Sequence, residues 1–335
     1  MKYLLSKKII IFYLLGIVLL LISILISLLV GPSNLNILKV FESLLFLNKN
    51  HPDFNIIWYV RIPRIIATLI CGSALSVSGL VLQKILSNKL ASPSTIGINS
   101  GALLAVSICS IIGFVESVYL FIFAFIGSLA TSMIIVFTSK KYSTSKGSII
   151  LMGVAINSLL VAITQMISIF SEDIVILSNE FRIGSFFHIF NDAIIPSCII
   201  SIVCFILLLI FSNKIDILTL GDDIASGLGL NVNLTRIIII IIISMLSGIS
   251  VSICGLVSFV GLIVPHIIKK VIKTNTFNHI IFSIIYGAMF VLICDTISRC
   301  VFSPYEIPVG IILAFIGVPV FIIVLVNKKG DHAYD

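Results

Sequence analysis

Long apolar runs recur from one end of this 335-residue chain to the other, and they constrain its fold more than any other feature. A helix that crosses the hydrocarbon core of a bilayer needs about 20 predominantly apolar residues. The chain is 59% hydrophobic and only 10% charged, with a mean hydropathy of +1.26, which is unlike a soluble domain. The sequence therefore predicts an all-α integral membrane protein, with one polytopic transmembrane domain over residues 1–335.

About ten transmembrane spans account for these runs. The first run is too long for the core of a signal peptide and no small-residue cleavage site follows it, so we interpret it as a retained span. The eighth span is short and closely follows the seventh, which leaves nine spans as the alternative. The predicted ranges are 9–30, 65–83, 96–113, 118–138, 148–170, 192–212, 237–254, 256–268, 279–297 and 307–326.

The positive charges indicate how the spans are oriented. With ten spans and an internal N-terminus, fifteen of the 21 lysines and arginines fall in inner loops and six in outer loops. Cytoplasmic loops carry such an excess. We therefore expect a multi-pass protein of the cell (cytoplasmic) membrane with both termini in the cytoplasm. Topology explains the net charge of +7, so no nucleic-acid partner is expected.

Arginines and lysines are distributed differently. Fourteen of the sixteen lysines fall in the predicted inner loops, whereas four of the five arginines fall outside: Arg61, Arg64, Arg182 and Arg299. Topology needs only positive charge, but the planar guanidinium also binds carboxylates bidentately. Arg61, Arg64 and Arg299 cluster at the outer ends of two spans, which favours binding to an acidic partner. Snorkelling to lipid head groups is the alternative for each of them.

Catalytic and nucleotide-binding motifs are absent from the sequence. The chain contains neither HExxH nor a G-x-x-x-x-G-K-[ST] phosphate loop, and its seven cysteines form no CxxC pair, so we expect no metal site and no cofactor. Ser100 and His266 leave an intramembrane hydrolase or a scaffold as a remote alternative, although no carboxylate accompanies them. Asp295 and Arg299, four residues apart, are the exceptional charges within a span. Ion-coupled carriers keep ionisable residues at mid-membrane, so a secondary transporter is the less favoured transport alternative.

Three blocks of sequence resemble one family of transport subunits. These blocks are "RIPRIIATLICGSALSVSGLVLQKILSNKLASPSTIGINSGA" (61–102), "GLVSFVGLIVPHIIKK" (255–270) and "DTISRCVFSPYEIPVGIILAFIGVPVFIIVL" (295–325). In order, and over essentially the whole chain, they are similar to signatures of the FecCD-type permeases. Those proteins are the membrane subunits of ABC importers for iron-siderophores, haem and cobalamin. The chain departs from the family pattern at Leu313, where threonine is usual, and at Arg182, where an apolar residue is usual. The departures concern the identity of the substrate rather than the class.

The resemblance implies an assembly as well as a fold. It implies a type II ABC importer permease bundle of ten helices per subunit, arranged as a homodimer with the solute path on the two-fold axis. It also implies two cytoplasmic ATP-binding subunits, so that the chain itself is not an enzyme, and an extracytoplasmic substrate-binding protein. In such assemblies, arginines at the positions of Arg61, Arg64 and Arg299 face outwards and pair with glutamates of the binding protein.

The inner segment "LGDDIASGLGLN" (220–231) is the candidate for contact with the ATPase. Asp222 and Asp223 fit the first turn of a short helix, where the helix dipole favours acids, and Gly227 and Gly229 fit its end. An ordinary loop is the alternative; the resemblance implies a coupling helix that lies in a groove of the ATPase. The predicted coupling residues are Leu220, Gly221, Asp222, Asp223, Ile224, Ala225, Ser226, Gly227, Leu228 and Gly229.

The fifth predicted span carries the candidate residues of the translocation path. Asn157, Thr164 and Ser168 follow one another at offsets of seven and four, which places them on one helical stripe, with Gln165 beside it. Polar side chains in such a position either line a hydrated path or hydrogen-bond across helices. The family's use of this helix favours the path.

Overall fold

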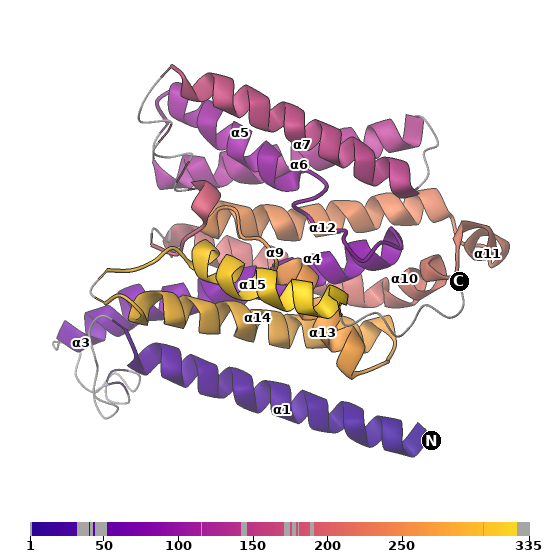
Figure 1. Cartoon of the computed structure of the whole chain (residues 1–335), viewed down its shortest axis with the longest axis horizontal. Coiled ribbons are helices and arrows are strands. Elements are labelled where there is room, and N and C mark those ends of the chain that lie inside the picture. The colour runs from indigo at the N-terminus through magenta and orange to yellow at the C-terminus, as the bar shows by residue number, and fades with distance from the viewer. Residues whose placement is uncertain are drawn as a thin grey trace.

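The structure, a computed structural model, describes residues 2–31, 40, 43, 52–114, 116–141, 146–170, 175, 179, 181–187, 191–303 and 305–326. Over those residues the regular elements are helices, with no strand, as the all-α class predicts. Figure 1 shows the long helices side by side along the length of the molecule. Four of the lysines counted in the topology prediction lie outside the described residues: Lys39, Lys49, Lys328 and Lys329.

Each of the ten predicted spans coincides with one helix. These helices are α1 (Lys2–Leu29), α4 (Ile62–Ile85), α5 (Ile98–Ile111), α6 (Ser117–Lys141), α7 (Lys146–Ser168), α9 (Asn191–Ile210), α12 (Val232–Cys254), α13 (Val260–Val271), α14 (Thr276–Cys300) and α15 (Val309–Val326). Between α9 and α12 lie two short helices, α10 (Ser212–Thr219) and α11 (Asp222–Gly227).

Most of these helices are long enough to cross a membrane. By length and composition, seven helical stretches of the described chain can do so, and α5 and α15 are shorter apolar helices. Helix α12 ends at Cys254 and α13 begins at Val260, so the seventh and eighth predicted spans are separate helices. With 12 residues, α13 is about 18 Å long and reaches only part of the way across a hydrocarbon core of about 30 Å.

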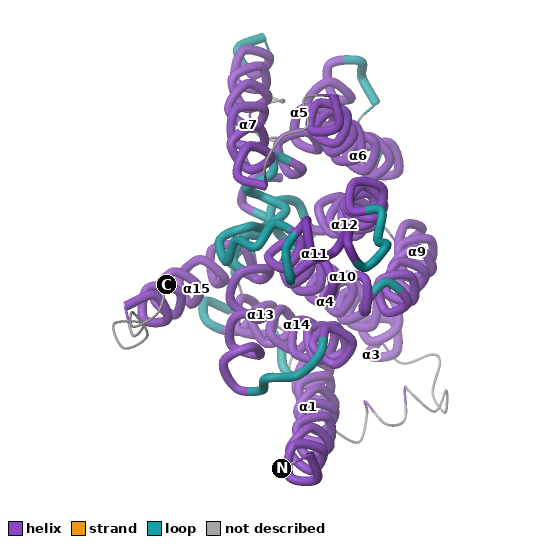
Figure 2. Tube along the Cα trace, turned by 90° about the vertical axis from the view of Figure 1, so that its right-hand side faces the viewer, coloured by secondary structure: helices purple, strands orange, loops and turns teal. Residues whose placement is uncertain are grey.

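Helix α4 is the centre of the bundle. In the apolar window of the stretch that contains α4, 89% of the residues are buried, against 11% for α1 and 17% for α7. In Figure 2, α1 and α7 lie at opposite margins, with α4 between them. A Cβ atom at Gly72 would clash with the carbonyl of Gly287 in α14, and one at Gly79 with the backbone of Gly261 in α13. Small residues on α4 therefore let its neighbours pack at backbone contact distance.

The chain enters α4 through a helical run that the sequence did not predict. The short helix α3 (Pro52–Asn55) and the π-helix η1 (Ile56–Arg61) continue directly into α4. Pro63 lies in the first turn of α4, a position that suits proline, but the chain is already helical before it. Proline has no N–H to donate to the preceding turn, and the π-helix, with its wider hydrogen-bonding pattern, ends two residues before Pro63. This run places Arg61 and Arg64 within one turn of each other.

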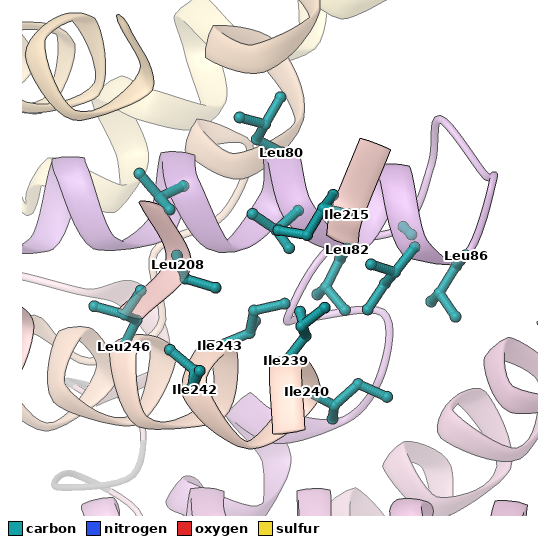
Figure 3. Close-up of a cluster of buried hydrophobic side chains, with 14 of the residues drawn as sticks. Leu80, Leu82, Leu86, Leu208, Ile215, Ile239, Ile240, Ile242, Ile243 and Leu246 are labelled. Atoms are coloured by element: carbon teal, nitrogen blue, oxygen red, sulfur yellow. The ribbon is translucent and has the colours of Figure 1, made fainter. Parts of the chain in front are cut away.

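A hydrophobic cluster holds the short helices against the bundle. Ile215 and Leu218 of α10 and Ala225 of α11 are fully buried, and they join the same cluster as Leu82 of α4 and Ile239 of α12. Figure 3 shows Ile215 between the side chains of α4 and α12. Burial of such aliphatic side chains contributes roughly 1.5–3 kcal/mol each. The cluster therefore fixes where α11 projects from the bundle.

Two ends of the bundle can be distinguished in Figure 1. The end that carries α3, the start of α4 and the end of α14 contains Arg61, Arg64 and Arg299, and we call it the arginine end. The opposite end carries α11 and the start of α1, and we call it the α11 end. The two sets of candidate contact residues thus lie at opposite ends, as the sequence predicts.

Candidate functional site

Arg64 is the centre of a buried ion cluster at the arginine end. Its Nε donates to both carboxylate oxygens of Asp295, at 3.1 and 3.2 Å, and its Nη2 donates to Asp295 Oδ1 at 2.9 Å. Its Nη1 donates to Oε2 of Glu306 at 2.8 Å. Arg64 thereby joins α4 to α14 and to the segment that leads into α15.

The other two arginines extend this cluster to α1. The Nε of Arg299 lies 3.2 Å from Oδ2 of Asp295, which confirms the predicted contact over four residues of one helix. Its Nη2 donates to the Ser27 hydroxyl at 2.7 Å, and Arg61 donates to the carbonyl of Leu28. All three predicted arginines are therefore brought together, and they tie α1, α4 and α14 to one another.

Burial distinguishes this cluster from a simple surface patch. Arg61, Arg64 and Arg299 are only 3%, 7% and 3% exposed. Buried ionised groups require partners, and each of these guanidinium groups has them within its own chain. Guanidinium groups enclosed among helices do not reach lipid head groups, so the snorkelling alternative does not fit. Sequence reasoning missed Glu306, although it lies in one of the three quoted blocks.

Helix α11 and the residues that flank it expose three apolar side chains at the other end. Asp222 and Asp223 stand in its first turn, as predicted. Leu220, Ile224 and Leu228, spaced four residues apart, are 57%, 55% and 63% exposed. Leu228 caps the end of α11 and its N–H donates to the carbonyl of Ile224, so these two side chains lie on one face of the helix. Leu220 precedes the helix, before Gly221, and adds a third exposed apolar side chain beside its start. We call Leu220, Ile224 and Leu228 the α11 stripe.

Sequence reasoning also missed the residue that holds α11 in place. The Nη2 of Arg236, in the first turns of α12, donates to both carboxylate oxygens of Asp222, at 2.8 and 2.9 Å. Arg236 is 7% exposed, whereas the side chain of Asp222 is 43% exposed. A signal was available, because Arg236 is the one arginine in the predicted inner loops.

A second ion pair lies between α10 and its neighbours. The Nζ of Lys84 lies 3.2 Å from Oδ1 of Asp216, whose Oδ2 accepts the backbone N–H of Thr276 at 3.1 Å. Desolvation by burial raises the pKa of Asp216, but hydrogen bonds from Thr276 and the charge of Lys84 outweigh it. The pKa of this carboxyl therefore lies below its ordinary value of 3.8. The pair joins α10 to α4 and α14.

The four predicted path residues do not share one environment. Thr164 is fully buried and donates to the carbonyl of Leu160 at 2.8 Å, and the Ser168 hydroxyl donates to the carbonyl of Thr164 at 2.9 Å. Asn157 is half-buried and Gln165 is exposed. Two of the four hydroxyl or amide groups are thus satisfied within their own helix, and Gln165 alone is on the open face of α7.

A small cavity lies beside the start of α5. Its polar lining includes Ser92, Ser94, Asn99 and Ser258. The Oδ1 atom of Asn99 is buried without a hydrogen-bond partner. The neighbouring Ser100, named in the hydrolase alternative, donates its hydroxyl within its own helical turn. No α7 residue is among the lining residues of this cavity, so the predicted path residues of α7 gave no indication of it.

Leu313, the departure from the resembled pattern in α15, is a core residue. It is fully buried and belongs to a cluster with Val257, Val260 and Val309. Its side chain therefore packs between helices.

In the described residues no group of three or more His, Cys, Asp or Glu side chains could hold a metal ion.

Together, these features define a class: a multi-helix membrane protein with a buried ion cluster at one end and a short, exposed helix at the other. The model of the FecCD transport family matches residues 19–327. The Fe(3+)-citrate import system permease protein YfmD of Bacillus subtilis is 34% identical over 307 residues, which cover 90% of each chain. The hemin transport system permease protein HmuU of Yersinia pestis is 30% identical and covers 93% of this chain and 96% of its own.

A solved structure gives the same result for the fold. It is described as an inward-facing metal-chelate type ABC transporter, with a TM-score of 0.85, 27% identity, and coverage of 96% of this chain and 99% of its own. The chain belongs to the FecCD transport family and is a membrane permease subunit of an ABC transporter. The resemblance of the three sequence blocks is thereby confirmed.

Proposed function

We propose that this permease moves an iron chelate, such as a ferric siderophore, ferric citrate or haem, into the cytoplasm. The observation that carries the proposal is the match over almost the whole chain to permeases named for iron-citrate and haemin, together with the metal-chelate type fold. A host strain that lacks the permease tests it. Uptake of radioactive iron from ferric citrate or from haemin is expected to return when the gene is restored. Equal uptake with and without the permease for ferric citrate, haemin and a panel of ferric siderophores would contradict the assignment.

Energy comes from two separate ATP-binding subunits that dock at the α11 end. The α11 stripe supports this, because its three apolar side chains are exposed, and Ile224 and Leu228 share one face of a short helix that could lie in a groove. The sequence contains no phosphate loop, so the purified chain is expected neither to bind nor to hydrolyse ATP. Saturable ATP binding by the isolated chain would contradict this division of labour.

A second copy of the chain covers the open face of α7. The exposed residues Ala155, Ser158, Ala162 and Gln165 follow one another at offsets of three and four, so they share one face of α7, which also carries the exposed Leu151 and Met166. In lipid, helices associate through such small residues. The solute path then runs between the two copies, with Gln165 on its wall. Cross-linking of a Ser158→Cys variant between copies tests this arrangement.

An extracytoplasmic binding protein docks at the arginine end through carboxylates that reach Arg61, Arg64 and Arg299. The convergence of the three guanidinium groups supports this, because a bidentate fork suits carboxylates. The arginine end then faces outwards and the α11 end inwards, with both termini in the cytoplasm. Residues 1–335 act as one transmembrane domain in this assembly.

A further inference from the structure

The two carboxylates that hold Arg64 differ in how firmly they are fixed. Asp295 lies within α14, its side chain is 1% exposed, and it also contacts Arg299. Glu306 lies in the non-helical segment before α15, its side chain is 22% exposed, and one hydrogen bond of 2.8 Å connects it to Arg64. Asp295 is therefore the more firmly held partner of Arg64, whereas Glu306 is the more accessible to water and to a competing carboxylate.

The remaining surroundings of Arg64 leave one side for a competitor. Asp295 occupies the edge of the guanidinium formed by Nε and Nη2. The ring of Phe187 covers one face, with its centroid 5.7 Å from Cζ. The Nη1 corner is held by Glu306, the more exposed of the two carboxylates. A carboxylate arriving from outside would meet the guanidinium at this corner.

The segment that carries Glu306 is connected to the rest of the arginine end. The backbone N–H of Ile307 donates to the carbonyl of Ser298 at 3.1 Å. Two residues after Pro308, the N–H of Gly310 donates to the carbonyl of Gly184 at 3.1 Å. A change in the position of Glu306 would thus be transmitted to the start of α15 and to the 181–187 segment.

We propose that Glu306 is an internal competitor for the docking site. In the undocked permease its carboxylate holds the Nη1 of Arg64. A carboxylate of the acidic docking partner replaces it, and the segment 305–308 at the head of α15 is released. This inference rests on the proposed docking at the arginine end. It explains why a contact arginine is buried and paired in the isolated chain.

Binding of the purified substrate-binding protein of the same import system to the permease in nanodiscs tests the competition. If Glu306 holds Arg64 for about nine-tenths of the time, removing it raises the apparent affinity about tenfold. Glu306→Ala and Glu306→Gln are therefore expected to bind the partner more tightly, the alanine variant by about tenfold. Glu116→Gln is the matched control. It removes the same charge from an exposed glutamate in another predicted outer loop and is expected to leave affinity unchanged.

A second readout follows the segment itself. Tyr305 is 80% exposed, so a spin label on Tyr305→Cys reports its mobility, with the unsubstituted chain as the correction for native cysteines. Addition of the partner is expected to increase the mobility of this label. The Glu306→Ala background is expected to show the increased mobility before any partner is added. An immobile label in both states would overturn the release of the segment.

Arginine variants separate this inference from the docking proposal. Arg61→Gln and Arg64→Gln are expected to weaken docking. If they do so while both Glu306 variants leave affinity unchanged or lower, the competition is overturned and docking stands. Arg61→Gln keeps the Asp295 pairs, so it remains informative if Arg64→Gln fails to fold. Equal affinity in all variants would overturn docking and the competition together.

Discussion

Arg236 of α12 forms an ion pair with Asp222 of α11, in which one guanidinium nitrogen, Nη2, lies 2.8 and 2.9 Å from the two carboxylate oxygens. The arginine is buried among the helices, while the aspartate stands at the base of the exposed α11 stripe. A movement imposed on α11 is therefore applied to α12, a 23-residue helix that runs through the bundle. Together with the buried side chain of Ala225, this contact links the proposed ATPase contact to the transmembrane helices.

Asp222→Ala is expected to uncouple ATP hydrolysis from transport, because it removes this link while leaving the α11 stripe in place. The ATPase subunits should still co-purify with the permease, and hydrolysis should continue with little uptake. Asp223→Ala, which removes the exposed neighbouring acid of the same turn, is the control. The double exchange Asp222→Arg with Arg236→Asp should recover part of the coupling. Full coupling in Asp222→Ala would exclude a role for the contact.

Ile224→Asp is expected to weaken assembly with the ATPase subunits. Burial of one such side chain in a groove contributes about 1.5–3 kcal/mol, which corresponds to roughly tenfold or more in affinity. Pull-down of the ATPase by detergent-solubilised permease measures the effect. Ser226→Asp adds the same charge at an exposed residue of α11 outside the stripe and should have the smaller effect. Equal losses in both variants would reduce the result to general charge repulsion.

Two glycine substitutions are expected to change stability in opposite directions. Gly79→Ala places a Cβ against the backbone of Gly261, so α4 and α13 must separate at a cost of about 1–3 kcal/mol. Gly227→Ala has no atom within 4 Å of the added Cβ, and alanine favours a helix over glycine by roughly 0.5–1 kcal/mol. Thermal unfolding of both variants in one detergent measures the difference. A stability loss in Gly227→Ala would show that α11 is not helical there.

The Lys84–Asp216 pair predicts a defined pH dependence. The pKa of Asp216 lies below 3.8 in the folded chain, so its ionised form is stabilised by folding. That contribution is fully present above the ordinary value of 3.8 and is lost as the pH falls through the lower, folded value. The difference in melting temperature between the natural chain and Asp216→Asn should stay constant at neutral and mildly acidic pH. It should shrink once the pH falls below 3.8 and approaches the lower pKa of the folded chain. A difference that disappears already near neutral pH would contradict this assignment.

The order of the helices could be read from the sequence because charges or turn residues separate the apolar runs. Helix α11 could also be predicted, since Asp222, Asp223 and the following glycines are local signals. The helical run over 52–61 lies before the predicted span 65–83 and was missed, because a proline such as Pro63 is typical of the first turn of a helix rather than of its middle. Hydrogen bonding of the π type before a proline has no comparable sequence pattern.

The candidate site could be predicted only where its contacts are local. Asp295 and Arg299 are one turn apart, so their ion pair followed from spacing. Arg64 and Asp295 are separated by 231 positions, and only the packing of α4 against α14 brings them together. The same holds for Glu306, which reaches Arg64 from a segment 242 positions away. Burial of the three arginines is likewise a consequence of tertiary packing.

The measurement that tests the central claim most directly is uptake by proteoliposomes that contain this permease, its ATP-binding subunits and its binding protein. The account predicts that radioactive iron presented as a chelate accumulates only when ATP is inside the cytoplasmic compartment and all three components are present. Ionophores that collapse proton and sodium gradients should leave the rate unchanged. Accumulation that needs no ATP and disappears with the ion gradients would contradict the account and identify the chain as a secondary carrier.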